Sequence, residues 1–206
     1  MTKEEDFKLL IASLDIYNGD MVFKNHTTSH IPPIGSTVIG DVFIAGNNIK
    51  TLDGCPIVVN GDFHCINNKL LYTLKGGPMR ISGECVIENS SLTSLRHAPV
   101  EVGSFQCTFN KIRTLLGGPS IVNGDYLVDN NNLIDLKGAP VIVNGDFNCS
   151  NNPLCSIKHL PKVITGSLIC FNTKKQFTIE QIKAICKIHG NIILTRREYF
   201  NIDDLK

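Results

Sequence analysis

The sequence predicts a repeat solenoid, in which one short β-strand per repeat stacks in parallel on the next to build a curved sheet. Three observations predict this fold. A glycine recurs every 20 to 22 residues, a proline stands four or five residues before most of these glycines, and a leucine or isoleucine closes each unit. A fixed period of this length is the signature of repeat architectures. The glycines are Gly19, Gly40, Gly61, Gly83, Gly103, Gly124, Gly145 and Gly166, the prolines are Pro56, Pro78, Pro99, Pro119, Pro140 and Pro161, and the closing residues are Leu52, Leu74, Leu95, Leu115, Leu136 and Ile157.

The residues after each glycine alternate between polar and apolar, which is the period-two pattern of a short strand. Stacking these strands in register creates two columns of inward-facing side chains. The second column accounts for four of the eight cysteines as small core residues. The first column is Val42, Phe63, Cys85, Phe105, Tyr126, Phe147 and Leu168, and the second is Ile44, Cys65, Ile87, Cys107, Val128, Cys149 and Cys170.

A polar column follows three residues after the second core column. Its members are Asn47, Asn68, Ser90, Asn110, Asn131, Asn152 and Thr173. Asparagine side chains at a turn can bond backbone groups that leave the sheet, so we expect a buried ladder here. The strand and its bends use most of each repeat, and the proline favours an extended path. We therefore expect an extended or 3₁₀ convex side.

The pattern Phe63-x-Cys65-x-x-Asn68-x-Leu70, with its copy at 147–154, resembles the signature of leucine-rich repeats. The short period with a proline resembles the bacterial class of these repeats, and the fuller Gly-Ala-Pro…Gly-Asp-Phe-x-Cys-x-Asn-Asn form is similar to repeats of bacteriophage and large-virus proteins. The resemblance covers roughly residues 19–173. It implies a leucine-rich-repeat arc that binds a protein partner, and, from the viral likeness alone, an inhibitor of a host defence protein.

Both ends of a solenoid need a cap, because the terminal sections expose apolar side chains and strand edges. We assign residues 1–18 to an N-terminal capping helix, 19–173 to about eight repeats, and 174–206 to a C-terminal helix and cap. The N-terminal stripe is Phe7, Leu10, Ile11 and Leu14, with Thr2 and Glu5 as a capping box.

At the other end, residues 178–189 place Ile179, Ile182, Ile185 and Cys186 at helical spacing, and Gly190 follows as a C-cap. Residues 192–194 are apolar and are expected to form a last strand. The tail after residue 195 carries both charge signs and two aromatics, and two conformations stay open for it: folding over the end of the stack, or remaining mobile.

Composition excludes several classes of function. The chain has 206 residues, 42% of them apolar, and a net charge of +1, which argues against nucleic acid or an anionic membrane as partner. Neither a signal peptide nor a membrane-spanning run is present, so we expect a cytoplasmic protein, in the host cytoplasm if the chain is viral. The cysteines contain no C-x-x-C pair, and neither the carboxylates nor His26 and His30 have metal-site spacing, so no metal or cofactor is expected.

The outward side chains of the strands define the candidate binding face, on the concave side of the arc. An acidic column borders a middle column with several apolar members, whereas lysine and arginine lie in the return segments. The candidate partner-binding residues are Asp41, Phe43, Asp62, His64, Glu84, Val86, Gln106, Phe109, Asp125, Leu127, Asp129, Asn148 and Phe171. An aspartate after glycine can also stabilise its own turn, so a purely structural role for the aspartates stays open.

These patterns predict a non-catalytic module that binds a protein with a basic and partly apolar patch. Only Cys55 and Cys155 lie outside the predicted core as candidate nucleophiles, and no catalytic residue is assigned. Two alternatives remain. A structural or self-assembling component would use a sheet edge or a cap as its contact and form homo-oligomers, and an enzyme or small-ligand binder would need a pocket with convergent polar groups.

Overall fold

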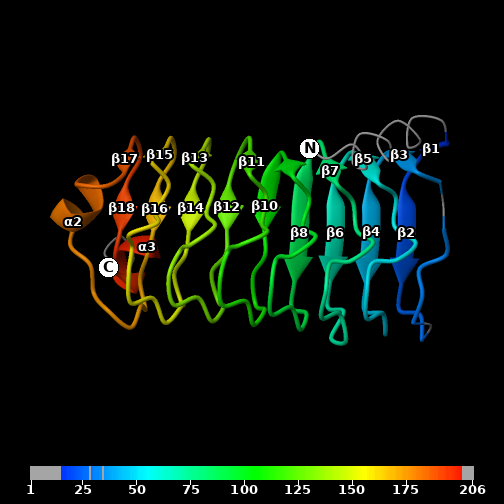
Figure 1. The fold of residues 1–206 in the computed structure, drawn as a ribbon, viewed down its shortest axis with the longest axis horizontal. Helices are drawn as coiled ribbons and strands as arrows, with labels where there is room; N and C mark the ends of the chain where they lie inside the picture. The colour runs from blue at the N-terminus through cyan, green and yellow to red at the C-terminus, as the bar shows by residue number, and fades with distance from the viewer. Residues whose placement is uncertain (1–14, 28, 34, 201–206) are drawn as a thin grey trace.

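The computed structural model describes residues 15–27, 29–33 and 35–200, and within them the chain is a parallel β-solenoid of about eight turns (Figure 1). Nine strands form one continuous parallel sheet, each paired with the equivalent strand about 21 residues away. The strands of this nine-stranded sheet are β2 (Met21–Lys24), β4 (Val42–Ala45), β6 (Phe63–Ile66), β8 (Glu84–Glu88), β10 (Ser104–Gln106), β12 (Tyr126–Leu127), β14 (Phe147–Asn148), β16 (Leu168–Ile169) and β18 (Ile192–Ile193).

Each turn contains a second strand, which the single-strand prediction missed. These strands precede the repeat glycine and form a flanking sheet of six strands that a three-stranded sheet continues. They are β1 (Ile16–Asn18), β3 (Thr37–Ile39), β5 (Val58–Asn60), β7 (Arg80–Ile81), β9 (Glu101–Val102), β11 (Ile121–Val122), β13 (Ile142–Val143), β15 (Val163–Ile164) and β17 (Lys187–Ile188). In these strands a buried residue such as Val59 alternates with residues that point outward, which is the pattern of an extended chain. The segment that returns to the repeat glycine therefore also pairs with its equivalent in the next turn.

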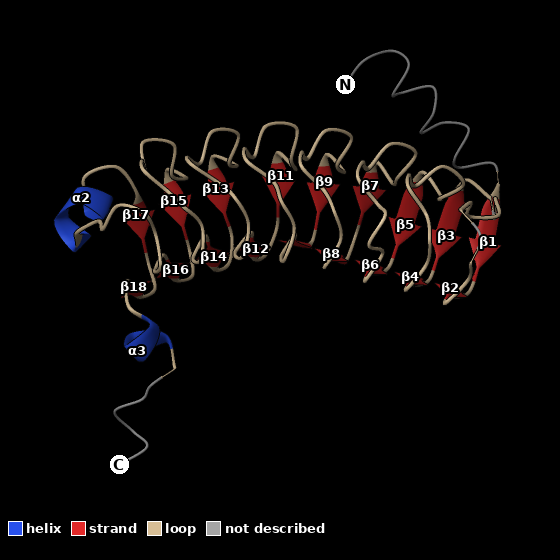
Figure 2. Cartoon of the chain, turned by 90° about the horizontal axis from the view of Figure 1, so that it is seen from below, coloured by secondary structure: helices blue, strands red, loops and turns tan. Residues whose placement is uncertain are grey.

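The stack curves gently, and the nine-stranded sheet lies along its concave side (Figure 2). The repeat glycine turns the chain from the flanking sheet into the nine-stranded sheet. A Cβ on Gly61 would lie 2.2 Å from the carbonyl oxygen of Gly40 and 2.6 Å from Oδ1 of Asp41. Close approach of successive turns therefore requires a glycine at this corner.

The two predicted core columns are confirmed, because every member of both is buried. The six repeat prolines and the six closing residues are buried as well. One signature position is wrong: Leu70 is 48% exposed, and Leu71 lies in the core instead. The interval from Gly61 to Gly83 is 22 residues long, and its extra residue shifts the buried leucine by one place.

The predicted ladder is confirmed at its five asparagines, whereas the hydroxyls of Ser90 and Thr173 bond carbonyl oxygens two residues away in their own turn. Asn68 donates from Nδ2 to the carbonyl oxygen of Ile44 (2.9 Å), and its Oδ1 accepts the backbone N–H of Asn47 (2.9 Å). Each amide thus satisfies backbone groups of the preceding turn. Asn47, Asn110, Asn131 and Asn152 repeat this arrangement.

The described chain gives no support to the predicted N-terminal capping helix of residues 1–18. Residues 1–14 lie outside the described residues, and Ile16–Asn18 form strand β1, which pairs with β3. Pairing in register with the next turn therefore decides the conformation of this segment.

The predicted C-terminal helix of residues 178–189 is shorter than its periodicity suggests. Helix α2 spans Ile179–Lys183, with a capping box between Thr178 and Gln181. The chain then forms β17, and the backbone N–H of Gly190 bonds the carbonyl oxygen of Gly166 (2.9 Å). Gly190 is thus a further corner glycine and not a C-cap, because pairing with the preceding turn overrides the helical pattern.

The predicted last strand is confirmed as β18, and the tail forms α3 (Arg196–Tyr199). Figure 2 shows α3 on the concave side of the last turn, below β18. Tyr199 packs against Phe171 with ring centroids 5.5 Å apart. The described part of the tail therefore contacts the end of the concave face.

Candidate binding face

The concave face is formed by the outward side chains of the nine-stranded sheet, which align in three columns. The column before the first core position is the corner column, the column between the core positions is the middle column, and the column after them is the far column. Within the described turns the three columns carry eight carboxylates, namely Asp20, Asp41, Asp62, Glu84, Asp125, Asp146, Glu88 and Asp129. From β2 to β16, Lys24 is the one lysine or arginine in these three columns. The concave face is therefore acidic, although the chain as a whole is nearly neutral.

The aspartates of the corner column have a structural role. Oδ1 of Asp41 accepts the backbone N–H of Asp62 (2.8 Å), and Oδ1 of Asp125 accepts that of Asp146 (2.7 Å). The same bond is made by Asp20, Asp62 and Asp146. In two turns a serine hydroxyl replaces the carboxylate as the acceptor, that of Ser104 and that of Ser167. Glu84 is the exception, because its carboxylate accepts no hydrogen bond in the described part of the chain. These bonds explain why aspartate or serine recurs there without reference to a partner.

An aromatic stack occupies the first turns of the middle column. The rings of Phe43 and His64 are parallel, with centroids 4.9 Å apart, and the Lys24 ammonium lies 5.0 Å from the Phe43 centroid. Nε2 of His64 is 3.9 Å from Oδ2 of Asp62. Both rings are partly exposed, so they present an apolar surface with charged groups beside it.

The other members of the middle column differ in accessibility. Gln106 and Leu127 are partly exposed, whereas Val86 and Asn148 are buried. Phe171, predicted in the far column, is only 5% exposed and contacts Tyr199. The structure therefore brings Phe43, His64, Gln106 and Leu127 to the surface and leaves little of the other three for a partner.

The far column contains a second acidic group around Thr108. Glu88 and Asp129 lie in register on either side of this threonine, one strand away in each direction. Burial is the largest cause that raises the pKa of Asp129, and the negative charge of Glu88 adds to it, while its own backbone N–H and the Asn130 amide oppose the rise. Oγ1 of Thr108 is buried and has no hydrogen-bond partner among the described residues.

Phe109, which follows Thr108, has an unusual backbone. Its φ is +52°, in the left-handed region, and its side chain is 53% exposed. The equivalent residues of the other turns are Asn25, Gly46, Asn67, Asn89, Asn130, Asn151 and Asn172, all with positive φ. Asparagine and glycine tolerate this conformation, whereas an aromatic residue there is a strained outlier. The sequence signal for this column is the Asn-Asn pair, whose first asparagine adopts the left-handed conformation.

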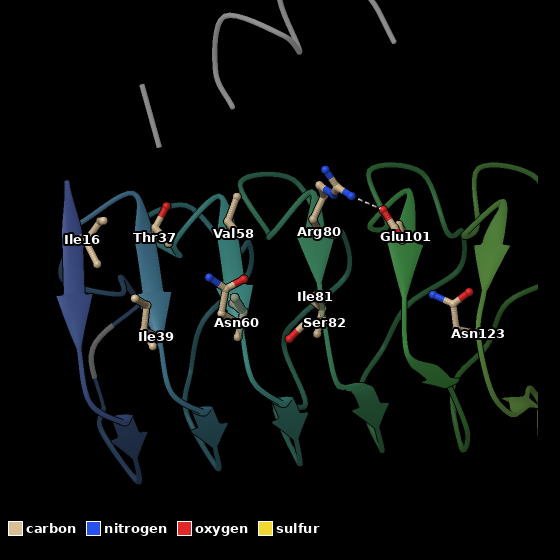
Figure 3. Close-up of a pocket in the computed structure, with 11 residues that line it drawn as sticks. Ile16, Thr37, Ile39, Val58, Asn60, Arg80, Ile81, Ser82, Glu101 and Asn123 are labelled. Atoms are coloured by element: carbon tan, nitrogen blue, oxygen red, sulfur yellow. Dashed lines mark hydrogen bonds and ion pairs between the residues drawn. The ribbon is translucent and has the colours of Figure 1, made fainter. Parts of the chain in front are cut away.

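The flanking sheet carries a shallow groove of about 710 Å³ over its first strands (Figure 3). Apolar side chains such as Ile16, Ile39 and Val58 line it together with Asn60 and Asn123. Among the described residues, Arg80 and Glu101 are the charged ones that line it, and they form an ion pair with each other. The described lining therefore presents no converging unpaired charges.

The described residues contain no group of three or more His, Cys, Asp or Glu side chains arranged to hold a metal ion. Most thiols are poor nucleophiles, because burial raises the pKa of Cys65 and Cys107 to about 12 and that of Cys55 well above its usual value. Cys155 is the exposed cysteine. Its sulfur contacts the carbonyl oxygen of Pro153 (3.6 Å), and no base from residues 15–27, 29–33 or 35–200 lies in hydrogen-bond contact with it.

None of the helices in the described chain is long and apolar enough to cross a membrane. Comparison of the chain with protein-family models, with curated proteins and with solved structures finds no match.

Proposed function

We propose that the protein is a non-catalytic binding module that docks a partner protein on the concave face. The observation that carries this proposal is the combination, on one continuous sheet, of eight carboxylates with the partly exposed Phe43, His64 and Leu127. Apolar anchors supply binding energy, and complementary charge steers the encounter and selects the partner. The partner surface then has a basic and partly apolar character.

Two narrower statements accompany this proposal and rest on sequence resemblance. The repeat is of the short leucine-rich type, as the Phe-x-Cys-x-x-Asn pattern suggests. The partner is a host defence protein in the cytoplasm, which only the likeness to bacteriophage and large-virus repeats supports.

The test is affinity capture of the tagged protein from the cells that make it, at ~150 mM and ~500 mM salt, with quantification by mass spectrometry. The matched variants are His64→Arg/Leu127→Arg on the concave face and Val58→Arg/Ile142→Arg on the flanking sheet. Each pair adds two positive charges to outward positions. We expect the wild type and the flanking-sheet variant to capture one protein stoichiometrically, and the concave variant to lose it. High salt should lower the amount of this protein that is captured.

Other outcomes contradict the proposal. Loss of the captured protein only in the flanking-sheet variant would move the binding site to the groove of Figure 3. Recovery of the chain alone, in multiples that both variants retain, would support assembly through the ends of the stack.

A further inference from the structure

A group of four residues, three in the far column of the concave face and one directly after it, differs from the equivalent residues of other turns. Glu88, Thr108 and Asp129 occupy the same column position in three successive turns, and Phe109 follows the central one. Adjacent parallel strands lie ~4.8 Å apart, so the two carboxylate-bearing positions are roughly 10 Å apart across Thr108. Side chains at that separation can contact one planar cationic group from both sides.

Thr108 gives an independent indication of a ligand. The residue is 4% exposed, and its Oγ1 is buried without a hydrogen-bond partner in the part of the chain that the structure describes. Strand alternation places its side chain on the concave face, because its neighbour Cys107 points into the core. A buried hydroxyl without a partner costs free energy. The described residues contain one other such hydroxyl, that of Tyr126 in the core, and the Thr108 hydroxyl is the one that lies between two carboxylate-bearing positions of the concave face.

Phe109 gives a second indication. It replaces the asparagine or glycine of the other turns with a residue that strains the left-handed backbone, and it leaves more than half of its side chain in solvent. Neither property helps the fold. Strained residues of this kind concentrate at binding sites, where the surrounding structure holds them in place.

We propose that Glu88, Thr108, Phe109 and Asp129 form a subsite for an arginine side chain of the partner protein. The guanidinium group has five N–H donors in one plane, which suits two carboxylates and a hydroxyl oxygen, and its face stacks on an aromatic ring. Lysine has three donors and no flat face, so it fits this set less well. The subsite rests on the proposed function and specifies the anchor that the partner contributes.

The subsite can be tested without knowing the partner. The probe is N-acetyl-L-arginine methylamide, titrated into the ¹⁵N-labelled full chain and followed by backbone amide shifts, with the lysine and citrulline analogues as controls. Citrulline keeps the shape of arginine without its charge. We expect arginine to shift the amides of residues 88–89, 108–110 and 129–130, lysine to bind roughly fivefold more weakly, and citrulline to cause no shift.

Substitutions assign the contacts. Glu88→Gln and Asp129→Asn should each raise the dissociation constant about five- to tenfold, and Phe109→Asn about threefold. Thr108→Val should raise the dissociation constant about threefold while leaving the fold intact, because the lost hydroxyl bonds no described residue. Glu84→Gln is the matched control, since it removes a carboxylate from the corner column of the same face.

The outcomes separate this subsite from the proposed function. Equal binding of citrulline or lysine, no shift with arginine, or an equal effect of Glu84→Gln would overturn the subsite. A protein captured through the concave face that Glu88→Gln/Asp129→Asn still binds would also overturn it, while the docking face would stand. Arginine binding without any captured protein would retain the subsite and contradict the proposed function.

Discussion

At the scale of single residues, the asparagine ladder determines how well each turn holds the next. Asn131 is buried, donates to the carbonyl oxygen of Cys107 (2.8 Å) and accepts the backbone N–H of Ile112 (3.2 Å). Asn131→Ala should lower the free energy of unfolding by about 2 to 3 kcal/mol, because both backbone groups lose their partner in a buried place. Urea denaturation measures this, with the exposed neighbour Asn132→Ala as the control. Equal effects of the two substitutions would contradict the ladder's role.

The strained position of Phe109 predicts a substitution that stabilises the protein. Phe109→Asn restores the residue used by six other turns and should raise the free energy of unfolding by about 1 kcal/mol. The reciprocal substitution Asn130→Phe should lower it by a similar amount. Chemical denaturation of both variants checks the prediction, and a loss of stability in Phe109→Asn would show that the aromatic ring packs favourably in the fold.

Asp129 predicts a pH dependence. Its pKa is raised in the folded protein, chiefly by burial, so the folded state binds the proton more tightly than the unfolded state does. As the pH rises from the unfolded pKa of ~3.9 toward the folded pKa, ionisation of this residue therefore lowers the free energy of unfolding. The loss of stability persists at every pH above the folded pKa. Asp129→Asn should be more stable than wild type at pH 7 and equal to it near pH 3. Urea denaturation at both values measures the difference, and an equal difference at both would exclude titration of Asp129 as its cause.

At the scale of elements, α2 depends on its capping box. The Thr178 hydroxyl accepts the backbone N–H of Gln181 (3.3 Å), and Oε1 of Gln181 accepts that of Thr178 (3.1 Å). Ile182 of this helix is buried, so α2 covers apolar side chains at the end of the stack. Thr178→Ala should cost about 1 kcal/mol and speed amide hydrogen exchange in 179–188. Thr195→Ala, at the capping box of α3, is the control and should affect only 195–200.

At the scale of the whole molecule, each turn contacts only its neighbours, so stability is distributed along the stack. In the nine-stranded sheet the central turns have a paired strand on both sides, while β2 and β18 lie at its ends, and the flanking sheet is interrupted between β11 and β13. Hydrogen exchange should be slowest for the buried strand amides of residues 59–150 and faster toward β1, β2 and β18. Uniform protection along the chain would instead indicate a single cooperative unit.

The repeat and its core could be predicted from the sequence because each turn repeats the same local requirement. A glycine is needed where successive corners nearly touch, an apolar residue where strand alternation points inward, and an asparagine where backbone leaves the sheet. Eight approximate copies reinforce one another, so an error in one copy, such as Leu70 for Leu71, leaves the fold prediction intact.

Tertiary structure alone decided the rest. Residues 178–189 have the apolar spacing of one helix, yet Lys187 and Ile188 join the stack because strand β17 finds a partner in β15. The sequence pattern places the aspartates in a column of the candidate binding face. In the structure their side chains accept hydrogen bonds from backbone N–H groups of the next turn, which gives them a structural role. The candidate site also needed three dimensions, because the free hydroxyl of Thr108 and the left-handed φ of Phe109 depend on neighbours about 21 residues away in sequence. Local pattern thus determines which residues face the core, whereas pairing between turns determines which outward residues remain free to bind.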